Sequence, residues 1–395
     1  MSEVDLKIET EDEGSEREPE KEGKKNSLQN FVNEFFANPK KRLIFIIAIG
    51  VIAIGLFGTG IYFLTQDKAT TLLKNNDDAK AGTENETKTA LFQAPLDGKM
   101  VTKEASERHP LAVIVENHTD ARPQSGLDKA SIVYEALAEG GITRFMALFG
   151  TEEAEKVGPV RSARTYFVDW THGYSAFFAH VGGNIDALEQ INKEKVFDLD
   201  QMAYGEPTFW RERIANLATE HTMYTSTIKL REIATKAGYS KANNFSVYKY
   251  KDEPSETEKV TIPETQKITV NFSNPRYNVY FQYDKATNSY KRFLAGTAHN
   301  DNITKNQITP KEIVVMTVKS QPTITKINEQ GLNMTTIGTG KAKIFLDGKS
   351  IDGSWKKDSK ADREIFLDGN GKEISFNRGQ LWICVVPEDV TPIVE

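Results

Sequence analysis

Residues 109–149 of this 395-residue chain read HPLAVIVENHTDARPQSGLDKASIVYEALAEGGITRFMALF and contain three short, mainly apolar runs, at 111–115, 131–134 and 145–149. Continuous apolar runs of this length are typical of strands that are buried on both faces of a sheet. The segments between them are polar and rich in turn-forming residues. The stretch therefore predicts the centre of a sheet whose strands end in polar loops.

Helical patterns alternate with strands further along the chain. Residues 163–173, 185–191 and 227–237 have helical periodicity, and residues 177–181 form another apolar run. Strands that alternate with helices favour an α/β or α+β domain. We expect this domain to span residues 91–250.

The composition changes at residues 251–264, where two prolines and dense charge indicate a linker. Residues 265–395 then predict a smaller, mostly β domain with seven short strands, at 268–272, 279–283, 290–294, 313–318, 342–346, 364–367 and 381–386. The Asp-Gly pairs at 347–348 and 368–369 are typical of hairpin turns, because glycine accepts the positive φ that such turns need. We expect each domain to carry its own core.

An apolar segment without charge, LIFIIAIGVIAIGLFGTGIYFL, occupies residues 43–64. A helix rises about 1.5 Å per residue, so this segment is long enough for the roughly 30 Å hydrocarbon core of a bilayer. A cleaved signal peptide is the alternative, but signal peptides have a shorter apolar region and a short N-terminal region. The sequence therefore predicts one uncleaved N-terminal transmembrane helix.

The flanks of this segment predict its orientation. Lys40, Lys41 and Arg42 precede it, and cytoplasmic flanks carry the excess of positive charge. We therefore expect residues 1–42 to be a disordered acidic cytoplasmic tail, residues 65–90 to be a flexible tether, and the rest to lie outside the membrane.

The overall composition excludes several classes of protein. A net charge of −6 argues against general nucleic-acid binding, and a hydrophobic share of 38% excludes a polytopic membrane protein. The single cysteine, Cys384, excludes an intramolecular disulfide and a multi-thiolate metal site, and we expect it to be a core thiol. The common cofactor and metal motifs are missing, so neither a cofactor nor a metal is expected.

The first of three polar clusters follows the run at 111–115 and comprises Glu116, Asn117, Arg122, Gln124 and Ser125. Ligands in α/β sheets bind at the carboxyl ends of strands, which places these residues well for a site. An ordinary polar loop with local turn hydrogen bonds is the alternative.

The second cluster places Glu135, Glu139 and Arg144 around a Gly-Gly step. Paired carboxylates can perform acid–base chemistry if their environments separate their pKa values. A structural ion pair between Arg144 and one of the glutamates is the alternative, and the sequence favours it.

The third cluster contains Arg161, Ser162 and Arg164 at the expected start of a helix. If Ser162 caps this helix, both arginines lie beside its free N–H groups, where an anion between them is favourable. Pairing of the arginines with Asp169, Glu135 or Glu139 is the alternative.

The histidines carry weaker evidence. His180 lies within an apolar run, where a hydrogen-bonded core histidine is commoner than a catalytic one, and His221 is similar. We interpret residues 198–200 as a solvated loop and His299 as part of a turn.

The strings at 109–145 and 157–170 (VGPVRSARTYFVDW) resemble the YerB-like family of bacterial envelope proteins, and residues 296–301, 338–349 and 379–387 resemble its smaller C-terminal domain. The resemblance implies a place on the outer face of mainly Gram-positive membranes and no particular activity. Family members resemble lipoproteins tethered through a cysteine, whereas this chain has a spanning helix instead. Thirteen residues match the polar signature of the family: Glu116, Asn117, Arg122, Gln124, Ser125, Glu135, Glu139, Thr143, Arg144, Arg161, Ser162, Arg164 and His180.

Together these features predict an envelope protein that binds an anionic ligand, such as a wall-glycan fragment or a phosphate-bearing precursor. The expected binding residues are Asn117, Arg122, Gln124, Ser125, Arg144, Arg161, Ser162, Arg164 and His180. An envelope enzyme, a glycan hydrolase or phosphotransferase, is the first alternative, with Glu116, Glu135 and Glu139 as candidate catalytic residues. A scaffold for cell-wall synthesis proteins is the second.

Overall fold

The computed structural model describes residues 90–239 and 245–395, which belong to one compact unit. The expected cytoplasmic tail at 1–42, the expected membrane helix at 43–64 and almost all of the expected tether at 65–90 lie outside these residues. Within the described ranges, no helix combines the length and the hydropathy needed to cross a bilayer.

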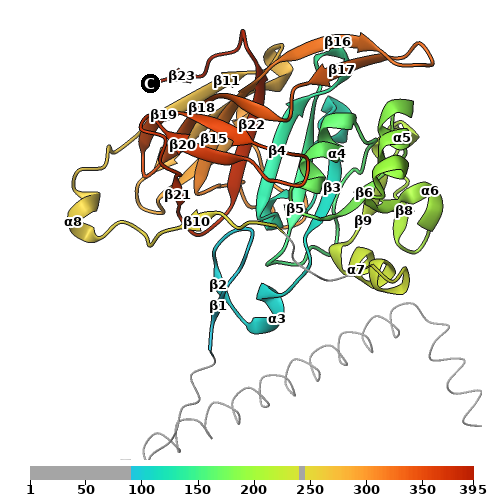
Figure 1. The fold of residues 1–395 in the computed structure, drawn as a ribbon, viewed down its shortest axis with the longest axis horizontal. Helices are drawn as coiled ribbons and strands as arrows, with labels where there is room; N and C mark the ends of the chain where they lie inside the picture. Colours follow the sequence, from blue (N-terminus) through green and yellow to red (C-terminus); the bar gives the residue numbers. More distant parts are fainter. Residues whose placement is uncertain (1–89, 240–244) are drawn as a thin grey trace, which may run out of the picture. The chain divides into compact units, whose positions relative to one another are not determined.

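A ten-stranded mixed sheet forms the centre of the described structure (Figure 1). Its strands follow one another in the order β20-β19-β18-β15-β22-β4-β5-β3-β6-β7. The first predicted domain supplies β3 (Leu111–Glu116), β4 (Ile132–Leu137), β5 (Thr143–Phe149), β6 (Phe177–His180) and β7 (Phe197–Asp200). The second supplies β15 (Glu312–Val318), β18 (Gly338–Leu346), β19 (Lys349–Lys357), β20 (Ile365–Asp368) and β22 (Leu381–Pro387).

The two predicted domains meet inside this sheet. Strand β22 pairs in parallel with β4, so that Leu381 lies opposite Ile132 and Cys384 lies opposite Glu135. On its other side, β22 pairs in parallel with β15. The backbone hydrogen bonds of the sheet therefore continue without a break from one predicted domain into the other.

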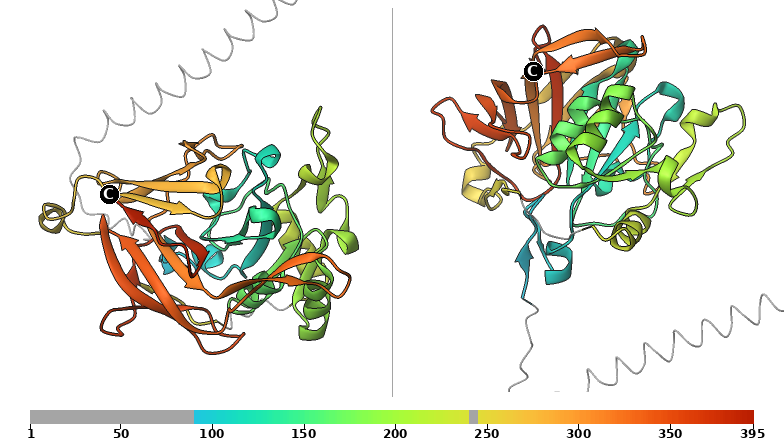
Figure 2. Two further views of the ribbon diagram at one scale, coloured as in Figure 1. Left: turned by 90° about the horizontal axis from the view of Figure 1, so that it is seen from above. Right: turned by 45° about the vertical axis from the view of Figure 1, so that its right-hand side comes forward.

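Different layers cover the two faces of the sheet (Figure 2). One face packs against a five-stranded antiparallel sheet of β14 (Thr297–Ala298), β13 (Ser289–Leu294), β12 (Asn278–Asp284), β11 (Lys267–Asn271) and β23 (Ile393–Val394). The same face also holds α7 (Thr227–Lys236). The other face is covered by α4 (Thr165–His172) and α5 (Ile185–Glu194).

Shorter elements connect these layers. The strands among them are β1 (Phe92–Gln93), β2 (Met100–Val101), β8 (Phe209–Arg211), β9 (Met223–Thr225), β10 (Lys249–Tyr250), β16 (Ser320–Ile324), β17 (Gln330–Met334) and β21 (Ser375–Phe376). The short helices are α3 (Lys103–Ser106), α6 (Gln201–Tyr204) and α8 (Glu256–Lys259), with 3-10 turns η1 (Thr119–Ala121), η2 (Leu127–Lys129), η3 (Glu139–Gly141), η4 (Thr219–His221) and η5 (Pro275–Tyr277).

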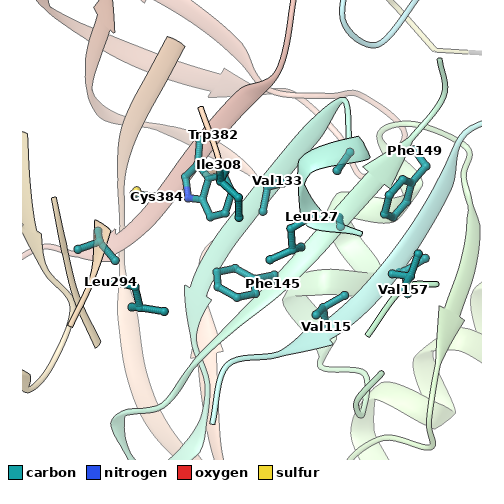
Figure 3. Close-up of a cluster of buried hydrophobic side chains, with 14 of the residues drawn as sticks. Val115, Leu127, Val133, Phe145, Phe149, Val157, Leu294, Ile308, Trp382 and Cys384 are labelled. Carbon is teal, nitrogen blue, oxygen red and sulfur yellow. The ribbon is translucent and has the colours of Figure 1, made fainter. Parts of the chain in front are cut away.

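The expectation of a separate core in each domain is wrong. On the face of the smaller sheet, Val133 and Phe145 pack in one cluster with Trp382, Cys384 and Ile308 (Figure 3). On the other face, side chains of α4 share a cluster with residues of β15 and β22. Each hydrophobic core therefore takes side chains from both segments. The predicted character of the segments is nevertheless found, because α4, α5 and α7 all lie in the first segment and the second consists mainly of strands.

Local patterns placed the three longest helices of the described ranges and most strands of the main sheet within a few residues. The all-buried strands β3 and β5 correspond to the continuous apolar runs, and the turn between β18 and β19 contains Asp347 and Gly348, both with positive φ. Cys384 is fully buried, as expected of a core thiol, and burial raises the pKa of its sulfhydryl well above the ordinary value. Residues 198–200, interpreted as a loop, instead belong to β7.

Candidate functional site

The first two polar clusters meet at one edge of the main sheet. Strands β3, β4, β6 and β7 run parallel to one another, and β5 runs antiparallel between β3 and β4. The carboxyl ends of four strands and the start of β5 therefore lie together. Glu116 closes β3 directly opposite Arg144, which is the second residue of β5.

The alternation of side chains along strands then divides these residues between two faces. Val133 and Phe145 belong to the core beneath the smaller sheet, and Glu135 and Thr143 share their side of the strands. Met146 belongs to the core beneath α4, and Arg144 shares that side. The residues predicted as one site therefore form two separate clusters, one on each face.

On the smaller-sheet face, a closed ring of hydrogen bonds connects six side chains that are at most 4% exposed. They are Asn117, Gln124, Glu135, Thr143, Arg292 and His299.

Arg292 is the charged centre of this ring. Its Nη2 donates to Oε2 of Glu135 at 2.7 Å, and its Nη1 contacts Nδ1 of His299. Because a guanidinium only donates, Nδ1 must accept, so His299 is neutral and carries its proton on Nε2. Burial and the neighbouring Arg292 charge lower the pKa of His299 well below its ordinary value. The guanidinium carbon lies 4.4 Å from the ring centroid of Trp382. The indole Nε1 of Trp382 donates to the same Glu135 oxygen at 3.2 Å.

Amide groups complete the ring. Nε2 of His299 donates to Gln124 Oε1 at 2.8 Å, and Gln124 Nε2 donates to Asn117 Oδ1 at 2.9 Å. Asn117 Nδ2 donates to Thr143 Oγ1 at 2.7 Å, and that hydroxyl donates to Glu135 Oε1 at 3.1 Å. The polar groups of Asn117, Gln124 and Glu135 are thus used inside the protein. Their position does not support the expected roles in binding or catalysis.

Arg122 and Ser125 also belong to this buried side. Arg122 donates from Nε and Nη2 to the side-chain and backbone oxygens of Asn117, both at 3.0 Å, and lies over the ring of Tyr277. Ser125 is fully buried and accepts a long hydrogen bond from Asn302 at 3.5 Å. Both residues contact the C-terminal segment. Arg122 is therefore not part of a common cluster with Arg144.

On the α4 face, two arginines are paired with carboxylates. Arg164 forms a bidentate pair with Glu139, in which Nη2 and Oε2 are 2.6 Å apart. Burial opposes ionisation of Glu139, but the hydrogen bonds and charge of Arg164 outweigh it and lower the pKa of that carboxyl. Nε of Arg161 lies 2.9 Å from Oε1 of Glu116. The expected pairing with Asp169, Glu135 or Glu139 is therefore found for Arg164. Arg161 is also paired, but with Glu116, which the sequence did not indicate as its partner.

Arg144 differs from these two arginines. It is 8% exposed, and its Nη1 donates to the backbone oxygen of Ser162 at 3.0 Å. Its Nε is buried without a hydrogen-bond partner, as is that of Arg161. Unlike Arg161 and Arg164, however, Arg144 forms no ion pair with a carboxylate of the described residues, although Glu139 is near enough for its charge to act on it. Burial, together with the charge of nearby Arg164, lowers the pKa of Arg144 to about 10. The predicted ion pair between Arg144 and a glutamate is therefore not found.

Two helices begin next to this arginine cluster. Helix α4 starts at Thr165 with Arg164 as its N-cap, and no side chain caps it, so the prediction that Ser162 is the cap is wrong. Ala163 forms a bridge with Gly183, which lies two residues before the start of α5. The amino ends of α4 and α5 therefore lie side by side, and the uncapped N–H groups of α4 add positive potential near Arg144.

His180 is a core residue, as the commoner interpretation of its pattern predicted. It is fully buried between two acceptors: Nδ1 lies 2.8 Å from the oxygen of Gly182, and Nε2 lies 2.9 Å from Oδ1 of Asp198. Both ring nitrogens therefore have partners inside the protein, so the ring connects β6 with β7 and is not available to a ligand.

His221 is a buried, hydrogen-bonded histidine, as its pattern predicted, but sequence patterns missed its partner and the roles of Arg292 and His299. Nδ1 of His221 lies 2.9 Å from Oε2 of Glu116, although 105 residues separate the two in the chain. Arg292 and Glu135 are 157 residues apart. No local motif reports such pairs. The sequence showed Arg292 only as one residue of a predicted strand and His299 only as part of a predicted turn.

Comparison with known proteins gives the family. The family model described as "Protein of unknown function (DUF3048) N-terminal domain" matches residues 96–240, and its C-terminal counterpart matches residues 268–383. The chain is 32% identical over 299 residues to "Putative lipoprotein YerB" of Bacillus subtilis (strain 168), covering 75% of this chain and 87% of that protein.

A solved structure supports the same relationship. The crystal structure of the YerB protein from Bacillus subtilis matches with a TM-score of 0.67 and 30% sequence identity, over 76% of this chain and 99% of that chain. The N-terminal family model matches the first segment of this chain, and the C-terminal family model matches the second. The chain therefore belongs to the two-domain, YerB-like DUF3048 family.

Proposed function

We propose that this protein is a membrane-anchored extracytoplasmic protein of the cell envelope that binds an anionic envelope component at Arg144. The apolar segment at 43–64 supports the anchor, and the relative named a lipoprotein supports attachment to a membrane. The ligand group is a phosphate or carboxylate, because these match the fork of a guanidinium.

The unpaired, buried charge of Arg144 carries the proposal. Removing a cation from water without a partner is costly, and the cost is offset when an anion binds next to it. Arg161 and Arg164 are already held by Glu116 and Glu139. The three arginines and two glutamates thus leave one positive charge uncompensated, beside the uncapped start of α4.

A cleft next to the cluster offers space for the rest of a ligand. It has a volume of about 400 Å³ and lies between η3, which includes Glu139, and the β16–β17 hairpin. Pro322, Ile324 and Leu332 give its far wall an apolar character. A ligand with an anionic group and an uncharged body would use both features.

Inorganic phosphate is the simplest probe of this site. We expect thermal unfolding of the wild type to shift upward in phosphate relative to chloride at matched ionic strength, because a ligand at 100 times its Kd stabilises the folded state by about 2.7 kcal/mol. Arg144→Gln should abolish the shift. The same variant should be no less stable than the wild type without phosphate, since it removes an unpaired buried charge.

Arg276→Gln is the matched control, because it removes the same charge from an exposed turn. This variant should keep the phosphate-dependent shift. Equal responses of the wild type and Arg144→Gln to phosphate would refute the site.

The proposed orientation gives a separate expectation. Protease added to intact cells without a wall should remove an epitope at the C-terminus and spare one at the N-terminus, because Lys40, Lys41 and Arg42 favour the cytoplasmic side. Immunoblotting of both epitopes, with and without detergent, measures this. A C-terminus that is protected until detergent is added would contradict the orientation.

A further inference from the structure

Three potential metal ligands lie together on the far side of Glu116 from the arginine cluster. They are His118, Asp120 and His221, and one ligand atom from each lies within 4.8 Å of the other two. We propose that these residues bind a divalent transition-metal ion of the Zn²⁺ type. Its ligands are distinct from the residues of the proposed anion site, although Glu116 contacts both sites, and the proposal does not depend on anion binding.

His221 is oriented as metal-binding histidines usually are. It is 6% exposed at the end of η4, and its Nδ1 lies 2.9 Å from Oε2 of Glu116. A carboxylate that accepts from Nδ1 fixes the tautomer and leaves the lone pair of Nε2 for a metal. The other oxygen of Glu116 is paired with Arg161 at 2.9 Å, so the carboxylate itself is held in place.

His118 and Asp120 offer their donors from one short turn. His118 caps η1, and its Nδ1 accepts from the backbone N–H of Asp120 at 3.3 Å. A nitrogen that accepts a hydrogen bond presents a lone pair, which is the group that a metal ion binds. Oδ2 of Asp120 lies 3.8 Å from the same nitrogen. The two side chains are 32% and 60% exposed, which gives an ion a route from solvent.

The three side chains must move closer together to coordinate an ion. Ligand atoms about 2.1 Å from a tetrahedral metal lie roughly 3.4 Å from one another, so the separations must shorten. The rings of His118 and His221 are now nearly parallel, with centroids 4.7 Å apart. Rotation of the half-buried His118, which gives up the hydrogen bond from the Asp120 N–H and the stacking on His221, brings a lone pair toward the shared position, while the buried His221 stays in place.

The chemistry of the donors selects the kind of ion. Two imidazoles and one carboxylate suit Zn²⁺ and its transition-metal neighbours, whereas Mg²⁺ and Ca²⁺ prefer sets composed of oxygens. Three protein ligands leave one position of a tetrahedral ion open to water or another small ligand.

Zn²⁺ titration of the untagged full-length protein, after removal of metal with a chelator, tests the proposal. We expect one equivalent to bind in equilibrium dialysis. Asp120→Asn, which changes an exposed side chain and leaves the fold intact, should remove this binding, and so should His118→Ala. Glu116→Gln should weaken it about 10–100-fold, the effect expected of an outer carboxylate.

His172→Ala is the control, since it removes a histidine that pairs with Glu194 elsewhere on the surface. It should bind Zn²⁺ as the wild type does. Co²⁺ provides a second readout, because the intensity of its visible absorption reports tetrahedral coordination. Failure of the wild type to bind one equivalent, or equal binding by the wild type and Asp120→Asn, would overturn the proposal.

Discussion

Arg292→Met should lower the free energy of unfolding by about 3–5 kcal/mol, because it leaves the carboxylate of Glu135 buried without its cation. Both side chains of this pair are fully buried, and their 2.7 Å contact joins the two family segments. The substitution also removes the donor to His299 and the guanidinium that lies against Trp382. Denaturant unfolding, followed by circular dichroism, measures the loss.

Two further variants separate the charge from the packing. Arg276→Met makes the same change at an exposed position and should alter stability by about 0.5 kcal/mol or less. Adding Glu135→Leu to Arg292→Met should recover a substantial part of the loss, since the buried charge is then gone. A cost below about 1 kcal/mol for Arg292→Met would show that the pair does not hold the segments together.

Neither segment should fold when it is produced alone. Separation of residues 91–250 from 265–395 would expose the paired edges of β4 and β22 and divide both hydrophobic cores. It would also place Glu135 and Arg292 in different molecules, so that each charge would lose its partner. We expect each fragment to lack a cooperative thermal transition, and the intact chain to unfold in a single calorimetric transition across both segments.

A cleavable linker provides the control for this experiment. A protease site inserted at residues 252–264, where most side chains are exposed, should permit cutting after folding. The cut halves should then stay together through their shared sheet. A cooperative melt from either fragment alone would restore the interpretation of independent domains.

The elements of this fold follow from local patterns. The apolar runs at 111–115 and 145–149 predicted β3 and β5, and the period of residues 185–191 predicted α5 from its first residue. Burial of both faces of a strand leaves a continuous apolar run, and burial of one helical face leaves a period of 3.6 residues. These patterns can be read in the sequence without knowing which element packs against the strand or helix.

The candidate sites could be predicted only in part. The first two polar clusters, which adjoin apolar runs, correctly pointed to the edge of the sheet where they meet. The pairing of Arg164 with Glu139 was among the expected alternatives. The sequence did not reveal that Glu135 and Arg144 serve different faces, since this depends on the exact register of β4 and β5. A shift of one residue in the register of these strands would move each side chain to the opposite face of the sheet.

The sequence alone determined the types of the main elements and the residue types available at the sheet edge. Only the tertiary structure decided that β22 joins β4, that Arg292 and His299 complete a ring with the first segment, and that Arg144 is left without a carboxylate. Propensity and periodicity are properties of neighbouring residues. The partner of a strand edge or a buried charge depends instead on which segments, far apart in the chain, share the same core.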